Sequence, residues 1–139
     1  MSLVIEIDEV IDEEVLKTIK NGIKTYNENY FGKYSFRNFL IYATLNEDEI
    51  IGGIYGSIMA DYAKVDMLWV DEKHRKHKVG TQLMTVLEEY AKQKSCKYIQ
   101  LDTFEFQAKP FYEKLGFKCI GTIPKWIKNY DCHFMRKEI

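Results

Sequence analysis

Hydrophobic and polar positions alternate with two periods along the chain, and these periods predict where helices and strands lie. Apolar residues recur every three or four positions through residues 12–30 and again through 80–94, the spacing of one helix face. A shorter helix is predicted over 107–115. The pair Asn21-Gly22 weakens the first helix by about 1 kcal/mol relative to alanine. That segment is therefore expected to form either one helix or two short helices with a hinge.

Segments rich in β-branched and aromatic residues predict the strands. The short polar link 46–48 joins two of them, which predicts an antiparallel hairpin. The element order is β-α-β-β-β-α-β-α-β-β, and its strand-helix-strand stretch requires a parallel pair joined by a crossover. We therefore predict an α/β fold with a mixed sheet of about seven strands flanked by helices. The predicted strands are 3–7, 36–44, 49–59, 63–70, 97–103, 117–121 and 132–137, with 122–131 as a connecting segment.

Length and composition predict one soluble globular domain over residues 1–139. The chain is 46% hydrophobic and 29% charged, which argues against disorder. A net charge of −1 gives no support for a nucleic-acid or membrane-surface partner. No segment approaches the roughly 20 apolar residues that span a bilayer. Residues 1–10 lack the basic and apolar regions of a signal peptide.

The cysteines and histidines predict neither a disulfide framework nor a metal site. The cysteines are odd in number and lack CxxC spacing, which favours small buried hydrophobic residues in a reducing cytoplasm. The histidines have no metal-ligand spacing to a cysteine or carboxylate, so no metal is expected. These residues are Cys96, Cys119, Cys132, His74, His77 and His133.

A basic turn joins the strand at 63–70 to the helix at 80–94. Residues 73–78 are four Lys or Arg and two His. The first-turn N–H groups of a helix have no acceptor within it, and the helix dipole places partial positive charge there. A strand that delivers such a turn to a helix N-terminus predicts an anion site. We therefore expect a phosphate-bearing ligand at 75–81.

Two short motifs give this site a more specific interpretation. The turn reads Arg75-x-x-Lys78-x-Gly80, and a later run, 111–117, reads FYEKLGF. Together they resemble the GNAT superfamily of acyl-CoA-dependent N-acetyltransferases, whose usual turn is Arg/Gln-x-x-Gly-x-Gly/Ala. The element order is similar to that family over essentially the whole chain. Lysine replaces the usual glycine at position 78, where glycine lets the backbone approach a pyrophosphate.

The resemblance implies that the ligand is acetyl-CoA, bound as a cosubstrate. It also implies a GNAT-like sheet that splays between its fourth and fifth strands to admit the thioester. Backbone groups of the fourth strand would pair with the pantetheine arm, and turn amides with nearby basic side chains would hold the pyrophosphate. The implied cofactor-binding residues are Leu68, Trp69, Val70, Arg75, Lys76, His77, Lys78, Val79, Gly80, Thr81, Thr103, Gln107 and Tyr112.

The same resemblance implies two catalytic residues. Tyr112 would protonate the leaving thiolate, since a phenol titrates near about pH 10 and a thiol near about 8.5. The acceptor amine must lose a proton, and Asp66 is the best candidate for its base; a structural or cation-binding carboxylate stays open as the alternative. Strand alternation would place Asp66, Leu68 and Val70 on one face. The weaker candidates for the base are Glu72 and Glu105.

These observations predict an N-acetyltransferase that moves an acetyl group from acetyl-CoA to a primary amine. No Cys or Ser has a base beside it in a motif, which favours direct transfer in a ternary complex. A CoA-binding sensor or interaction domain without transferase activity is the alternative. The acceptor is expected to be a small molecule, and a homodimer is a further expectation from the resemblance. The aromatic residues expected to border the acceptor cleft are Tyr26, Tyr30, Phe31, Tyr34, Trp126 and Tyr130.

Overall fold

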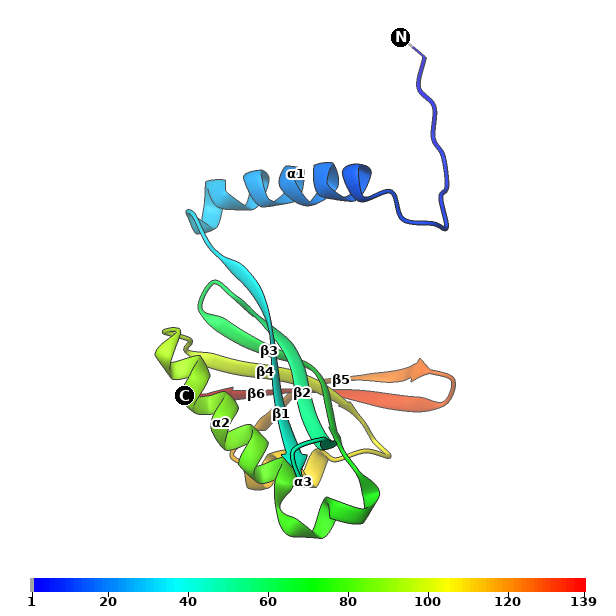
Figure 1. Cartoon of the computed structure of the whole chain (residues 1–139). Helices are drawn as coiled ribbons and strands as arrows, with labels where there is room; N and C mark the ends of the chain where they lie inside the picture. Colours follow the sequence, from blue (N-terminus) through cyan, green and yellow to red (C-terminus); the bar gives the residue numbers. More distant parts are fainter. Residues whose placement is uncertain (1) are drawn as a thin grey trace. The chain divides into compact units, whose positions relative to one another are not determined.

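The computed structural model of the chain describes residues 2–139, which form two compact units (Figure 1). One unit runs to Tyr34 and the other spans Ser35–Ile139. The single domain expected over 1–139 stays a prediction. Within the described residues, no helix combines the length and the apolar character needed to cross a membrane.

The first unit contains one helix, α1 (Glu13–Phe31). Asp12 caps it, because its carboxylate accepts hydrogen bonds from the amides of Glu14 at 3.0 Å and Val15 at 3.2 Å. Gly32 ends it with φ 74°. The helix continues through Gly22, so the alternative of two short helices is wrong. A single glycine costs about 1 kcal/mol, which the remaining turns and the cap offset.

The predicted strand at residues 3–7 is absent from the structure, which places neither helix nor strand in residues 2–12. The apolar alternation there is real, but a strand exists only when its backbone groups are paired with a neighbour. No described strand pairs with this segment. The described sheet therefore has six strands where about seven were expected, while the mixed α/β class is confirmed.

The second unit is a six-stranded sheet in the order β1-β2-β3-β4-β6-β5. Every neighbouring pair is antiparallel except β3 and β4, which are parallel, as the crossover predicted. The elements are β1 (Phe36–Leu45), β2 (Glu49–Met59), β3 (Tyr62–Val70), the 3₁₀ helix η1 (Glu72–His77), α2 (Val79–Gln93), β4 (Tyr98–Phe104), α3 (Lys109–Lys114), β5 (Lys118–Ile127) and β6 (Tyr130–Glu138).

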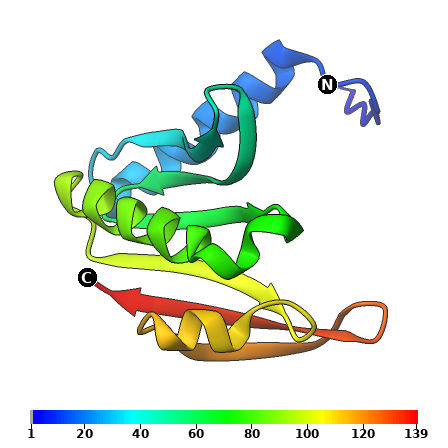
Figure 2. The same cartoon turned by 60° about the horizontal axis from the view of Figure 1, so that its bottom comes forward.

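The helices α2 and α3 lie on the same face of this sheet (Figure 2). The buried residues of α2, such as Leu87, pack there against inward-facing strand residues such as Ile54, Ile99 and Met135. The amphipathic pattern predicted for 80–94 is thus confirmed as core packing. We call the sheet face turned away from these helices the far face.

The last two strands are longer than predicted. The segment 122–131, expected to connect them, instead continues β5 and β6 as a hairpin. Pro124 is compatible with this position, because β5 is an edge strand and the register shifts around the proline. Cys119 on β5 is exposed, which corrects the expectation that it is buried, whereas Cys96 and Cys132 are buried as predicted.

Candidate active site

The sheet opens between its two parallel strands. β3 and β4 pair only over Tyr62–Val65 with Tyr98–Leu101, although both strands continue beyond these residues. The part of β3 after Val65 stays paired to β2 on one edge, and its other edge faces β4 without a ladder. The splay between the predicted fourth and fifth strands is therefore present, as β3 and β4.

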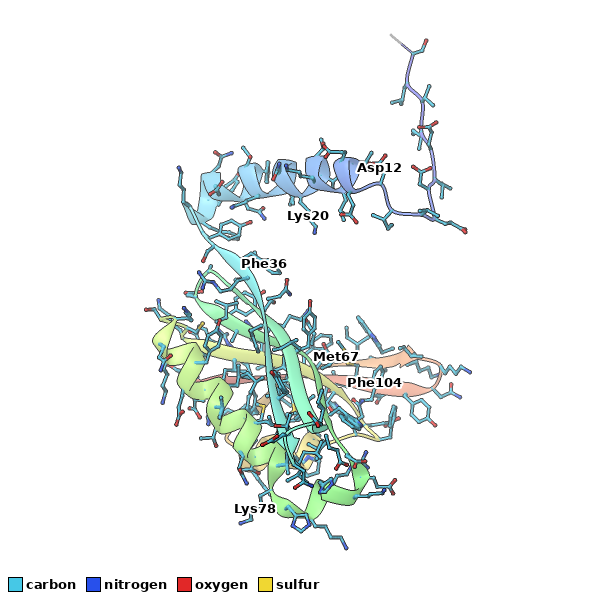
Figure 3. The ribbon with its side chains drawn as sticks, in the orientation of Figure 1. Asp12, Lys20, Phe36, Met67, Lys78 and Phe104 are labelled. Carbon is cyan, nitrogen blue, oxygen red and sulfur yellow. The ribbon has the colours of Figure 1, made fainter. Side chains whose placement is uncertain are left out.

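A cleft of about 890 Å³ lies at this gap. Figure 3 labels Met67 and Phe104, one from each wall, and Lys78 in the turn before α2. Twelve predicted site residues line the cleft. They are the predicted base Asp66 and eleven of the predicted cofactor-binding residues: Leu68, Trp69, Val70, Arg75, Lys76, Lys78, Gly80, Thr81, Thr103, Gln107 and Tyr112.

A β-bulge alters which way the side chains of β3 point. The β2–β3 register shifts between Tyr55 and Gly56, where Gly56 pairs with Val65 but Tyr55 pairs with Met67, so Asp66 is the extra residue. Leu68 and Val70 pack against the helix-side core, whereas Asp66 is an exposed residue and pairs with Lys64. The expectation that Asp66, Leu68 and Val70 share one face is therefore wrong.

Lys78, which replaces the usual glycine, adopts the backbone conformation that glycine favours. It is the N-cap of α2 with φ 57° and ψ 28°, in the left-handed region. A side chain in that region costs about 1–2 kcal/mol. The turn therefore keeps its geometry with lysine present, at a cost in stability, and its backbone N–H is retained.

This strain predicts that Lys78→Gly stabilises the fold by about 0.5–1 kcal/mol, after allowing for the greater freedom of glycine in the unfolded chain. Urea unfolding checks the expectation. Lys78→Ala is the matched control, since it removes the same ammonium group but keeps the strained conformation. Equal stability of the two variants would contradict a backbone origin.

The N-terminus of α2 supplies unpaired donors to the cleft. The first amide of this helix bonded to a preceding carbonyl is that of Gln82, which donates to Lys78 at 3.0 Å. The amides of Val79, Gly80 and Thr81 thus have no intrahelical acceptor. Arg75 closes the turn, because its Nε donates to the Val70 carbonyl at 3.1 Å.

Two predicted site residues on the β4 side of the cleft, Thr103 and Gln107, stabilise the turn between β4 and α3 through hydrogen bonds. The Gln107 side-chain oxygen accepts hydrogen bonds from the Phe104 amide at 2.7 Å and from Thr103 Oγ1 at 3.3 Å. Thr103 Oγ1 in turn accepts from the Ala108 amide at 3.3 Å. These contacts fix where α3 begins, and so where it places Tyr112 beside the gap.

Tyr112 is buried on α3 and lines the cleft, with only 6% of its surface exposed. Its ring makes edge contacts with Phe111 and Phe117, at centroid distances of 5.1 and 5.8 Å. Burial, with a contribution from the charge of Asp102, raises the pKa of Tyr112 to about 12. The phenol therefore stays protonated over the whole physiological pH range.

His77 and Val79 are the two predicted cofactor-binding residues that do not line this cleft. Their side chains line a second hollow between β1 and α2, together with His74. His74 also meets Asp71 and Glu49, with one ligand atom of each within 4.8 Å of the others. Sequence spacing missed this group because Glu49 comes from the start of β2; the absence of a metal stays a prediction.

Several cleft residues were not predicted from the sequence. They include Asp102 on β4, whose alternation with buried Leu101 and Thr103 could have shown that it points to the far face. Phe104 stacks on Phe106 at 5.4 Å, and Phe106 contacts Tyr130 at 4.8 Å. The remaining unpredicted lining residues are Val65, Met67, Ala108 and Phe111.

The splayed parallel pair, the helix N-terminus beside it and the buried phenol at the gap form the arrangement that the resemblance to GNAT acetyltransferases implied. Comparisons with known proteins support an acyltransferase. Residues 8–117 match the model of the acetyltransferase (GNAT) family. Blasticidin-S acetyltransferase of Streptomyces morookaense is 30% identical over 102 residues, 73% of this chain and 75% of that protein.

Two solved structures extend the comparison. An acetyltransferase from Bacillus cereus ATCC 14579 is 31% identical, with a TM-score of 0.83 over 96% of this chain and 98% of its own. A Bacillus anthracis protein described as a streptothricin acetyltransferase, solved with acetyl coenzyme A, is 24% identical, with a TM-score of 0.65 over 73% of this chain and 62% of its own. The chain belongs to the GNAT acetyltransferase family and is an acyltransferase.

Proposed function

We propose that this enzyme transfers an acetyl group from acetyl-CoA to the primary amine of a small molecule, directly and within a ternary complex. One observation carries the proposal: the gap between β3 and β4 leads from the free N-terminus of α2 to the buried Tyr112. A single bound thioester could place its phosphates at one end of this path and its carbonyl at the other.

The described residues fit acetyl-CoA at two points. The unpaired edge of β3 at Leu68–Val70 offers backbone groups to a pantetheine amide, as an added strand would. The free amides of α2, with the charges of Arg75, Lys76 and Lys78, suit a pyrophosphate. At Gly80 an added Cβ would lie 3.2 Å from the Phe111 ring, so glycine lets the first turn of α2 pack closely against Phe111.

The reaction then needs two proton transfers. As the amine nitrogen bonds to the acetyl carbonyl carbon, it must give up a proton to a base. As the carbon–sulfur bond breaks, the thiolate takes the proton of Tyr112. We assign Tyr112 as the general acid. Asp66, which lines the cleft at the gap, is the candidate for the general base indicated by the sequence.

The raised pKa of Tyr112 makes a prediction for the pH dependence. Because the neutral phenol persists to about pH 12, kcat should show no falling limb from loss of this proton below about pH 11. A pH–rate profile with saturating acetyl-CoA, limited to the range where the fold is intact by circular dichroism, measures this. A falling limb near pH 9–10 that disappears in Tyr112→Phe would contradict the raised pKa, although it would still identify Tyr112 as the acid.

The nature of the acceptor rests on similarity. The relative from Streptomyces morookaense is named for blasticidin S, which supports a small-molecule acceptor for this chain. The structure with acetyl coenzyme A likewise supports the donor. A cytoplasmic location, consistent with three free cysteines, and a homodimer remain parts of the proposal.

Two measurements test the proposal together. Thermal shift with CoA and acetyl-CoA reports binding, and thiol release over a panel of amines reports transfer. We expect stabilisation by both ligands and amine-dependent thiol release. Stabilisation without turnover on any amine would favour a CoA-binding module, and no stabilisation would refute the proposed donor.

A further inference from the structure

Two carboxylates occupy equivalent places on the two sides of the gap. The last pair of the parallel ladder is Val65 with Leu101, so Asp66 and Asp102 are the first residues past it on β3 and β4. Both line the cleft. Asp102 is on the far face, since its neighbours Leu101 and Thr103 are buried on the helix side.

The two carboxylates differ in their partners. The ammonium of Lys64 lies 3.5 Å from Asp66 and compensates its charge. Within residues 2–139, no cation is paired with Asp102. A carboxylate that is already paired with lysine is a weaker acceptor for a substrate proton than one that is not, so the pairing favours Asp102.

Asp102 and the acid of the reaction line the same cleft. The charge of Asp102 adds to the effect of burial in raising the pKa of both Tyr112 on α3 and the Cys132 thiol on β6. Both groups are therefore neutral at physiological pH. Other charged groups on this face are Asp66 and Lys64 across the gap on β3, and Arg136 on β6, which pairs with Gln100 two residues before Asp102.

Resting on the proposed function, we propose that Asp102 is the catalytic residue that takes the proton from the acceptor amine and returns it to Tyr112. The nitrogen–carbon bond forms and the nitrogen loses its proton to the Asp102 carboxylate. The carbon–sulfur bond breaks and the thiolate takes the Tyr112 proton. The Asp102 proton then returns to the tyrosinate through water in the cleft, which restores both residues without any further reactant.

The surface beside Asp102 indicates the class of the acceptor. Met67 and Trp69, 61% and 52% exposed, line the cleft on the β3 side. The strand registers continue this wall across the far face, from Met67 to Tyr55 and Leu40. A single carboxylate without a cation, next to an apolar wall, suits a monoamine with an apolar or aromatic body better than a polycation.

Steady-state kinetics with 2-phenylethylamine, n-butylamine and spermidine test both parts. In the wild type, kcat/KM for 2-phenylethylamine should exceed that for spermidine by at least about tenfold, from burial of the ring. Asp102→Asn should lower kcat by about 10²-fold and change the slope of the pH–rate profile, and Asp102→Glu should restore part of the loss. Asp66→Asn should cost less than Asp102→Asn.

The outcomes separate this inference from the function on which it rests. Thiol release that prefers spermidine, or a larger loss in Asp66→Asn than in Asp102→Asn, would overturn the inference and leave the acetyl transfer intact. Unchanged pH dependence in a folded Asp102→Asn would do the same. Binding of acetyl-CoA without transfer to these three amines or to any amine of the wider panel would refute both.

Discussion

Replacing Tyr112 with phenylalanine should lower kcat by about 10²- to 10³-fold, while the Kd for acetyl-CoA changes by less than about threefold. The substitution removes one hydroxyl group from a buried ring and keeps the ring contacts with Phe111 and Phe117. The thiolate would then leave without a proton donor, so the loss belongs to the chemical step. Thiol release under saturating donor, with calorimetric titration of acetyl-CoA, measures the two quantities.

The matched control for this variant is Tyr90→Phe. Tyr90 is a half-buried tyrosine on α2 whose ring contacts Phe39 at 5.5 Å, and it does not line the cleft. Its hydroxyl should be dispensable for turnover. If Tyr112→Phe kept wild-type kcat, Tyr112 would be only a packing residue.

The sequence predicted those parts of the fold that depend on residues close together in the chain. The 46–48 hairpin and the apolar stripe of α2 depend only on residues close together in the chain, and the structure contains both. The strand at 3–7 failed because alternation cannot show whether a segment finds a partner. The predicted ends of β5 and β6 were wrong because Pro124 argues against a strand unless that strand lies at the edge of a sheet. The position of β5 at the edge is a tertiary property that local sequence does not show.

The candidate site shows the same division. The basic turn and Tyr112 belong to contiguous motifs, so the sequence placed them in one cleft. Asp102 was missed because its importance depends on where the β3–β4 ladder stops, and no local pattern marks that residue. The orientation of Asp66 was wrong because the bulge opposite Tyr55 and Gly56 adds one residue to the strand period.

Replacing Thr81 with aspartate should affect stability and ligand binding in opposite directions. Thr81 is in the first turn of α2 and lines the cleft. A carboxylate there interacts favourably with the helix dipole by about 0.3–1 kcal/mol, so the thermal stability of the free protein should not fall. The same carboxylate would repel a pyrophosphate a few ångströms away. Because such a repulsion reaches about 4 kcal/mol near a protein surface, we expect the Kd for CoA to rise at least about 30-fold.

The control for this variant is Thr85→Asp, one turn further along α2. Thr85 is exposed and outside the cleft, and its hydroxyl donates to the Thr81 carbonyl at 2.9 Å. Thr85→Asp adds the same charge to the same helix. Its effect on CoA affinity should stay below about threefold, because exposed charges a turn away are screened by salt.

Titrations of both variants with CoA at low and high ionic strength measure the difference. Equal weakening in the two variants would mean that net charge, and not the N-terminus of α2, controls binding. A lower melting temperature in Thr81→Asp would mean instead that damage to the turn causes the loss. Weakening confined to Thr81→Asp, in a protein at least as stable as the wild type, would place the phosphates at the first turn of α2.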